Sequence, residues 1–336
     1  MISYSFLRRA APALGFGFFL AFGSSLGQTY FISLFAGELR TALDLSHGAF
    51  GGLYSIATTA SAVTLVWLGK LADRFDLVGL SVLMLATLAG CALLMARVDS
   101  ILWLAVALFG LRLGGQGMLS HLSMTAMARW FTRERGRALS VAVLGFPAGE
   151  ALLPIAVALT LVLLTWRQIW AGAALIMVAV AIPLIMWLGH KIREQGLDRP
   201  EPRLSAANGQ CDASWTRAQV LRDVRFYGLL PGLLAPPFII TGVLFHQIHL
   251  LEVKAWTLSD FAACYPLYAG TATLVALGIG WLVDRYGALR LLPLYLLPLG
   301  LGLALLGIYY MFKEGFGWAD FGRAVEAADE KEEAIA

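Results

Sequence analysis

Residues 69–75 read GKLADRF and residues 280–287 read GWLVDRYG, and these two stretches decide how the chain is organised. They share the pattern Gly-x-Leu-x-Asp-Arg-aromatic and begin 211 residues apart. Each follows an apolar run and ends it with charged residues. A pattern that recurs at the same place in two parts of a chain indicates an internal repeat, so we expect two related halves.

The apolar runs have the length and composition of membrane-spanning helices. Hydrophobic residues make up 59% of the chain and charged residues 14%, with a mean hydropathy of +0.74, whereas a soluble domain carries about 25% charged residues. The runs are about 20 residues long, as a helix that crosses the hydrocarbon must be, and they lack the alternation of barrel strands. The sequence therefore predicts an all-α polytopic membrane helix bundle with nine spans, near residues 12–36, 48–70, 77–97, 101–128, 138–163, 167–189, 226–251, 258–283 and 288–312.

The basic residues between the predicted spans fall mostly on one side of the membrane. The loops of one side hold seventeen lysines and arginines, and those of the other side hold four. Because short cytoplasmic loops carry the excess, we predict a multi-pass protein of the cell inner membrane with a cytoplasmic N-terminus. Arg8 and Arg9 precede the first run, which we interpret as an uncleaved helix because further spans follow it.

The polar segment 190–225 divides the chain as a cytoplasmic linker loop would. It separates an N-terminal six-helix half, residues 1–189, from three spans in residues 226–312. The repeat puts the counterparts of spans four to six after these, where a polar acidic tail, residues 313–336, follows instead. We therefore expect a C-terminal half that lacks three helices. A truncated sequence, a frameshift and a natural nine-helix chain all fit this pattern.

The repeated stretch resembles the loop motif of the major facilitator superfamily, which lies between spans two and three. The resemblance implies a latch of charges and helix ends that governs alternating access. The matching residues are Gly69, Asp73 and Arg74 in the first copy and Gly280, Asp284 and Arg285 in the second. Helix-end charges that obey the positive-inside rule are the simpler alternative. The stretches GQTYF, residues 27–31, and FHQIHLLEVKAW, residues 245–256, are most similar to bacterial members near the monocarboxylate and oxalate/formate carriers.

Two charged residues are predicted inside the membrane. Arg112 lies near the middle of the fourth span and Glu150 at a similar depth in the fifth, where a charge is costly and usually faces a cavity or a partner. Gln116 follows Arg112 at helical spacing, and RLGGQG resembles the family's span-four motif. We hypothesise that Arg112 and Glu150 pair in a proton-dependent switch. The alternatives are a permanent ion pair and a Glu150 that faces a water-filled cavity without coupling.

Three further stretches hold candidate packing or substrate residues. GFPAGEALLP, residues 145–154, resembles the family's span-five antiporter motif, but its glycines also suit close helix packing, which we favour. In the first span, Gln28 and Tyr30 would suit a substrate-facing wall. In the seventh, a break at two adjacent prolines followed by His246 indicates a substrate contact or an outer gate.

These features predict a secondary active transporter of a small organic solute, an organic anion held by Arg112, which works by alternating access with proton coupling or exchange. Drug efflux by the same fold is one alternative, and a non-transporting truncated membrane protein is another. The sequence has no nucleophile, phosphate-binding or dinucleotide-binding motif, so we predict neither enzyme activity nor a cofactor. No metal site is predicted, because no four-ligand set lies near the histidines. The expected partners are the solute, protons and the lipid bilayer, and a net charge of +3 predicts no nucleic acid.

Overall fold

The computed structural model describes residues 4–131, 134–197, 217–254, 257–286, 288–291, 294 and 296–314, in two compact units. Unit 1 comprises residues 1–213 and 241–277, and unit 2 comprises residues 214–240 and 278–336. Residues 198–216 of the predicted linker and residues 315–336 of the predicted tail lie outside the described residues, as do the side chains of Asp73 and Asp284.

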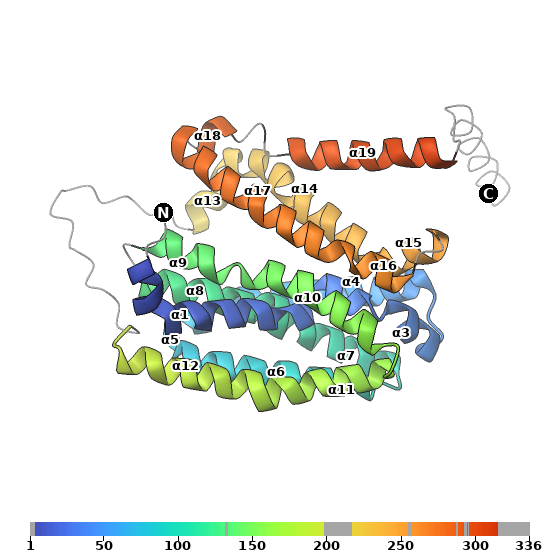
Figure 1. The fold of residues 1–336 in the computed structure, drawn as a ribbon, viewed down its shortest axis with the longest axis horizontal. Coiled ribbons are helices and arrows are strands. Elements are labelled where there is room, and N and C mark those ends of the chain that lie inside the picture. The colour runs from blue at the N-terminus through green and yellow to red at the C-terminus, as the bar shows by residue number, and fades with distance from the viewer. Residues whose placement is uncertain are drawn as a thin grey trace. The chain divides into compact units, whose positions relative to one another are not determined.

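Throughout the described part of the chain the regular elements are helices, which confirms the predicted all-α membrane bundle (Figure 1). Among the described residues, seven segments are long and apolar enough to cross a membrane: Phe6–Ser33, His47–Leu68, Leu77–Ala96, Ile101–Trp130, Arg135–Thr160, Trp166–Glu194 and Val224–Phe245. They correspond to the first seven predicted spans. At the other two predicted spans the chain forms α17 (Cys264–Tyr286) and α19 (Leu297–Glu314).

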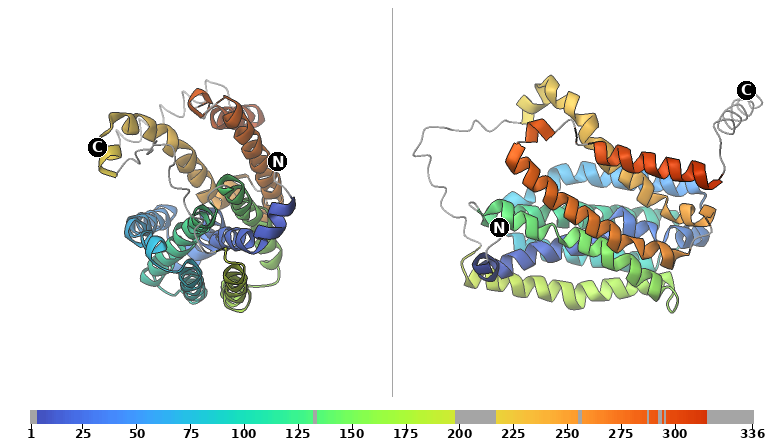
Figure 2. Two further views of the ribbon diagram at one scale, coloured as in Figure 1. Left: turned by 90° about the vertical axis from the view of Figure 1, so that its left-hand side faces the viewer. Right: turned by 45° about the horizontal axis from the view of Figure 1, so that its top comes forward.

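The helices of unit 1 run side by side around α1, as the two views of Figure 2 show along and across the bundle. Before the linker the elements are α1 (Tyr4–Gly23), η1 (Ser24–Gly27), α2 (Thr29–Ser33), α3 (Ala36–Leu43), α4 (His47–Leu68), α5 (Leu71–Arg74), α6 (Leu77–Ala96), α7 (Ile101–Leu111), η2 (Arg112–Leu119), α8 (Ser120–Trp130), α9 (Arg135–Ala142), α10 (Gly145–Thr160), α11 (Trp166–Ile176), η3 (Met177–Ala181) and α12 (Ile182–Glu194). Helix α1 packs against α8, α9, α10 and α12, while α6 packs against α7 and α11. The first span is therefore the centre of the unit.

The later elements are shared between the units. Unit 1 also contains α15 (Gln247–Lys254), α16 (Leu258–Ala262), the end of α14 (Val224–Phe245) and the start of α17. Unit 2 contains α13 (Arg217–Arg222), the start of α14, the end of α17, α18 (Ala288–Leu291) and α19.

Polar residues at the ends of the apolar runs start the helices of unit 1. The Ser46 hydroxyl accepts from the Ala49 N–H at 3.1 Å at the start of α4, and the Asp76 carboxylate accepts from the Gly79 N–H at 2.7 Å at the start of α6. Thr165 forms a capping box with Gln168 at the start of α11. Such caps satisfy N–H groups that have no partner within the helix, so short polar turns fix where these three helices begin.

Unit 1 has a packed aromatic interior and an apolar outer surface. Trp170 is fully buried, and its ring lies 5.3 Å from that of Phe31 and 5.2 Å from that of Phe35, measured between centroids. By contrast, Leu152 and Leu159 on α10 are 59% and 64% exposed. Exposed apolar side chains along a long helix suit contact with lipid.

The regular α-helical path is interrupted in the first and fourth spans. The prediction of a break at Pro236 and Pro237 is wrong. Between η1 and α2, Gln28 is extended, with φ −78° and ψ 151°, and η2 is π-helical. Helix α14 continues through both prolines and ends at Phe245. Membrane helices tolerate proline because neighbouring groups satisfy the freed carbonyls, so adjacent prolines alone did not locate the discontinuity.

Candidate functional site

The interruption in the first span sits against the π-helical segment of the fourth, in glycine-to-glycine contact. A Cβ added to Gly115 would lie 2.7 Å from the Cα and the nitrogen of Gly27. A Cβ added to Gly27 would overlap the Leu111 carbonyl oxygen. Since no side chain fits at either position, the two glycines allow the backbones of η1 and η2 to touch.

Arg112, at the start of η2, holds this contact in place. Its side chain is buried, and one terminal nitrogen donates to the Gly27 carbonyl at 3.0 Å and to the Thr29 hydroxyl at 3.2 Å. The guanidinium lies 5.3 Å from the centroid of the Tyr54 ring, and the Tyr54 hydroxyl donates to the Thr29 hydroxyl at 2.9 Å. Arg112 therefore donates hydrogen bonds to a carbonyl and a hydroxyl group at the point where the backbone of the first span is no longer helical.

A polar cavity of about 300 Å³ lies beside this break and is named the central cavity. Its lining residues are Ser25, Gln28, Tyr30, Gln116, Ser120, Phe146 and Glu150. Four of them, from spans one, four and five, were candidates in the sequence: Gln28, Tyr30, Gln116 and Glu150. Ser25 and Phe146 were missed, because a serine or a phenylalanine in an apolar run gives no signal by itself. The structure thus brings together residues that lie far apart in the sequence.

Several polar atoms of the central cavity lack a partner. The hydroxyl of Tyr30, the side-chain oxygen of Gln116 and the hydroxyl of Ser120 are buried without a hydrogen bond to any described residue. A buried polar group left unpaired costs about 1–3 kcal/mol. Three such groups facing one polar cavity indicate that water or a bound solute satisfies them.

Close packing of α10 on the first span places Glu150 at the cavity. A Cβ on Gly149 would overlap the Ser25 hydroxyl and lie 2.9 Å from the Tyr30 hydroxyl. A Cβ on Gly145 would overlap the Phe18 carbonyl oxygen. These contacts confirm the packing interpretation of the span-five glycines. Glu150, one residue after Gly149, is half-buried and is the charged side chain that the lining includes.

The hypothesised Arg112–Glu150 ion pair is not formed. Both residues are described, and no contact within 4.0 Å joins their charged atoms. The expectation rested on the similar depth of the two residues in neighbouring spans, and Gln116 was placed at helical spacing behind Arg112. Because η2 has i→i+5 bonding, its register differs from that of an α-helix, and Gln116 lines the cavity while Arg112 contacts Gly27, Thr29 and Tyr54. A permanent ion pair is therefore a wrong interpretation for this conformation.

At the end of the seventh span the buried polar residue is Gln247, not His246. His246 is exposed and does not line the central cavity. The Gln247 amide nitrogen donates to the Tyr30 carbonyl at 2.8 Å and to the Ser33 hydroxyl at 2.7 Å, and the Tyr265 hydroxyl donates to the Gln247 side-chain oxygen. An amide in an apolar run was the signal that could have identified Gln247.

The loop-motif residues lie at helix ends. Gly69 follows α4, and Asp73 and Arg74 belong to α5. Next to them the Arg129 guanidinium donates to the Ala72 carbonyl at 2.6 Å, and Asp76 pairs with Arg193 at 2.7 Å. In unit 2 the second copy, Gly280, Asp284 and Arg285, lies in the last turns of α17. The latch that the resemblance implies stays a prediction, since the carboxylate groups of Asp73 and Asp284 fall outside the described residues.

Comparison with known proteins gave a match to a family. The family model of the Major Facilitator Superfamily matches residues 17–321. Neither the curated proteins nor the solved structures gave a match. The family match covers most of the chain and agrees with the apolar helices, so this multi-pass membrane protein belongs to the Major Facilitator Superfamily of transporters.

Proposed function

We propose that the protein is a secondary active transporter that moves a small polar organic solute through the central cavity, with Glu150 carrying the coupled proton. The observation that supports this is the cavity itself. Unpaired polar atoms of Tyr30, Gln116 and Ser120 meet one carboxylate there. Polar and ionisable groups inside a membrane are costly and are typical of substrate and proton paths.

The chemistry follows from these groups. The hydroxyls and the amide would exchange their water for the hydroxyl, carbonyl or amine groups of a solute. Glu150 would take up a proton when the cavity opens to one side of the membrane and release it when the cavity opens to the other. Coupling then requires that solute and proton bind in a linked way at the same cavity.

An organic anion is less well supported than an uncharged or cationic solute. Arg112 was expected to hold the anion, but it is not among the residues that line the central cavity, and one of its terminal nitrogens donates to the Gly27 carbonyl and the Thr29 hydroxyl. The charged lining residue is Glu150, which would repel an anion and attract a cation. Export of an organic cation in exchange for protons is therefore the second candidate function.

We further propose that the N-terminus is cytoplasmic and that the membrane is the cell inner membrane. The support is the excess of lysine and arginine in the loops on the side of the N-terminus, since short cytoplasmic loops carry such an excess. In this orientation the turn between α10 and α11 faces outward.

The test is transport by the purified full-length protein in liposomes with an imposed pH gradient. A panel of uncharged, cationic and anionic solutes is added, and the internal pH is followed by a trapped dye. We expect an uncharged or cationic solute to dissipate the gradient, and Glu150→Gln to abolish the solute-dependent proton flux. Glu194→Gln, at the exposed end of α12, is the matched control and should retain the flux. Proton flux that Glu150→Gln leaves unchanged would refute coupling through Glu150.

A further inference from the structure

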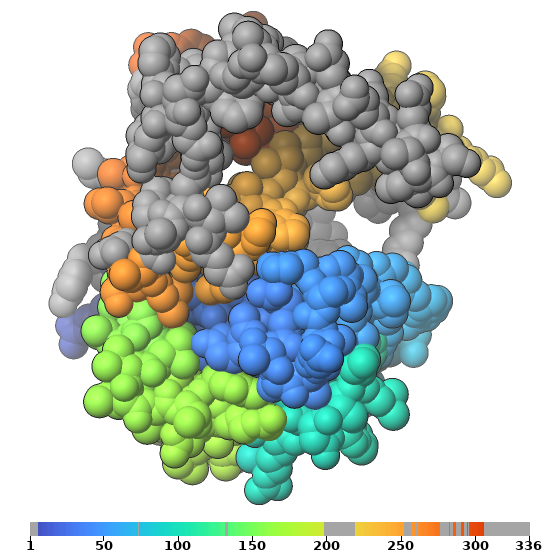
Figure 3. All heavy atoms as spheres, turned by 90° about the vertical axis from the view of Figure 1, so that its right-hand side faces the viewer, coloured from blue at the N-terminus to red at the C-terminus, as the bar shows by residue number. Residues whose placement is uncertain are grey.

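Unit 1 has a second hollow at the end of the bundle away from the start of α1. Figure 3 looks onto this end, with α3 and the start of α4 in blue and the turn before α11 in yellow-green. The hollow has a volume of about 830 Å³ and is lined by residues of α3, α11, α15 and α16 and their flanks. It shares no lining residue with the central cavity. It is named the end groove.

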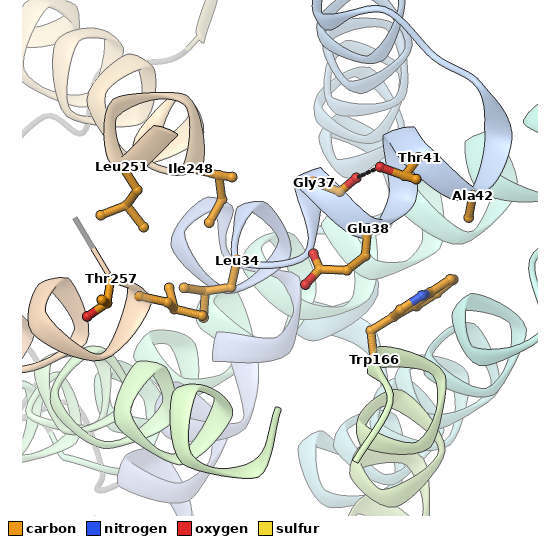
Figure 4. Close-up of a pocket in the computed structure, with 10 residues that line it drawn as sticks. Leu34, Gly37, Glu38, Thr41, Ala42, Trp166, Ile248, Leu251 and Thr257 are labelled. Carbon is orange, nitrogen blue, oxygen red and sulfur yellow. Dashed lines mark hydrogen bonds between the residues drawn. The ribbon is translucent and has the colours of Figure 1, made fainter. Parts of the chain in front are cut away.

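Among the residues that the structure describes, the charged side chain that lines the end groove is Glu38. Figure 4 shows its carboxylate directed into the space between α3 and Trp166. Glu38 is half-buried, and no basic group of the described residues lies within 4.0 Å of it. The nearby Thr41 hydroxyl donates to the Gly37 carbonyl at 2.9 Å. Burial raises the pKa of the Glu38 carboxyl, because desolvation disfavours the charged form.

The walls around this carboxylate are aromatic and aliphatic. Trp166 lies below Glu38, and Leu34, Ile248 and Leu251 face the groove from the other side (Figure 4). The indole is held in place, since the Arg167 guanidinium lies 4.3 Å from its centroid and also donates to the Val98 carbonyl at 2.8 Å. An aromatic ring beside a carboxylate is a combination that attracts organic cations.

We propose that the end groove binds a soluble organic monocation with an apolar body, whose charge lies at Glu38 and whose body packs on Trp166 and Leu251. Three features carry this. The carboxylate is half-buried and has no basic side chain of the described residues within 4.0 Å, so part of its desolvation cost is one that a bound cation would remove. The volume suits a drug-sized molecule, since ligand sites span about 300–1,000 Å³. The rest of the wall is mostly apolar, with Thr41 and Thr257 as its other polar side chains, which matches the chemistry of such a cation.

This inference does not depend on which solute the central cavity carries. With the proposed orientation, the end groove opens on the outer side of the membrane, where a soluble cation in the medium would reach it without transport. Binding can therefore be measured in the absence of any gradient.

The test is calorimetric titration of the purified full-length protein with benzyltrimethylammonium, and with benzenesulfonate as its anionic counterpart. We expect the cation to bind and the anion not to bind. Glu38→Gln should weaken binding of the cation at least about tenfold, the effect of losing a charge pair worth about 1.4 kcal/mol. Trp166→Leu should weaken it about threefold, within the range of an exposed cation–π contact.

Matched variants distinguish binding at Glu38 from binding elsewhere in the protein. Asp44→Asn, an exposed acid that ends the same helix, should keep the wild-type affinity. A Glu38→Gln protein that binds the cation as tightly as wild type would overturn the proposal. The proposal would also be overturned if the Glu150→Gln protein lost binding of the cation while the Glu38→Gln protein kept it, because the cation would then bind in the central cavity. Failure of the wild-type protein to bind at millimolar concentration would overturn it as well.

Discussion

Replacing Gly115 by alanine should separate the first span from the fourth. The added Cβ would lie 2.7 Å from the Gly27 Cα, whereas carbon atoms in contact are about 3.5–4.0 Å apart. The backbones of η1 and η2 would have to move apart by about 1 Å. Overpacking of this kind costs about 1–3 kcal/mol, and the movement would also lengthen the hydrogen bond from Arg112 to the Gly27 carbonyl.

The assay is thermal unfolding of the purified protein in detergent. At about 2–4 °C per kcal/mol, a cost of this size means that Gly115→Ala should lower the Tm by about 2–12 °C. Gly90→Ala is the control, because Gly90 lies in α6 with no atom within 4 Å of an added Cβ. In a helix interior, replacing glycine by alanine should stabilise the folded protein by about 0.5–1 kcal/mol. Equal Tm values for the two variants would refute the glycine contact between η1 and η2.

Three further variants test neighbouring parts of the structure. Arg112→Lys should lower the unfolding free energy by about 2 kcal/mol, because an ammonium cannot keep both hydrogen bonds and the stacking on Tyr54; an unchanged Tm would show that the guanidinium contacts do not stabilise the break. Gln247→Leu should lower the Tm, because the Tyr265 hydroxyl and the Ser33 hydroxyl would each lose a hydrogen-bond partner, and a buried polar group without a partner is costly. A Tm equal to that of the wild-type protein would contradict this. Glu38→Gln should raise the Tm at pH 8, where the desolvated carboxylate is ionised. The pKa of Glu38 in the folded protein is raised, so the gain in Tm should shrink as the pH falls through that pKa. The gain should vanish below about pH 4, which is under the pKa of glutamate in the unfolded chain. A gain in Tm that does not depend on pH would contradict the view that the half-buried carboxylate of Glu38 is destabilising.

Much of the fold could be predicted because the bilayer constrains it strongly. A span must be apolar over about 20 residues, so runs such as those before Gly69 and Arg97 reveal their helices directly. The same rule identified Arg112, Gln116 and Glu150 as candidate site residues, since each is a polar or charged residue within an apolar run. The prediction that the C-terminal half lacks three helices stays a prediction.

The details of the site could not be predicted, because they depend on local departures from the α-helix. Similar depth in neighbouring spans suggested that Arg112 and Glu150 pair, but depth does not say which way a side chain points. The π-helical segment that begins at Arg112 changes which side chains share a face, and the contacts of Arg112 are Gly27 and Thr29. The break at Gln28 arises from the contact of Gly27 with Gly115, 88 positions later in the numbering, which no local pattern encodes. Gln247 was passed over in favour of its neighbour His246 for a similar reason, because its partners Tyr30 and Ser33 lie in the first span.

The central claim is that the cavity between spans one, four and five is a water-filled path, and cysteine accessibility tests it most directly. Ser120 and Ser123 lie on the same helix, but the Ser120 hydroxyl faces the central cavity without a partner, while Ser123 is fully buried and donates to the Gly17 carbonyl at 2.7 Å. In a protein whose three cysteines are replaced by serine, Ser120→Cys and Ser123→Cys are treated with a small, positively charged methanethiosulfonate reagent in membranes. Rapid modification of Ser120→Cys and none of Ser123→Cys is the predicted result. Modification of Ser123→Cys alone, or of neither variant, would contradict a water-filled cavity at this place.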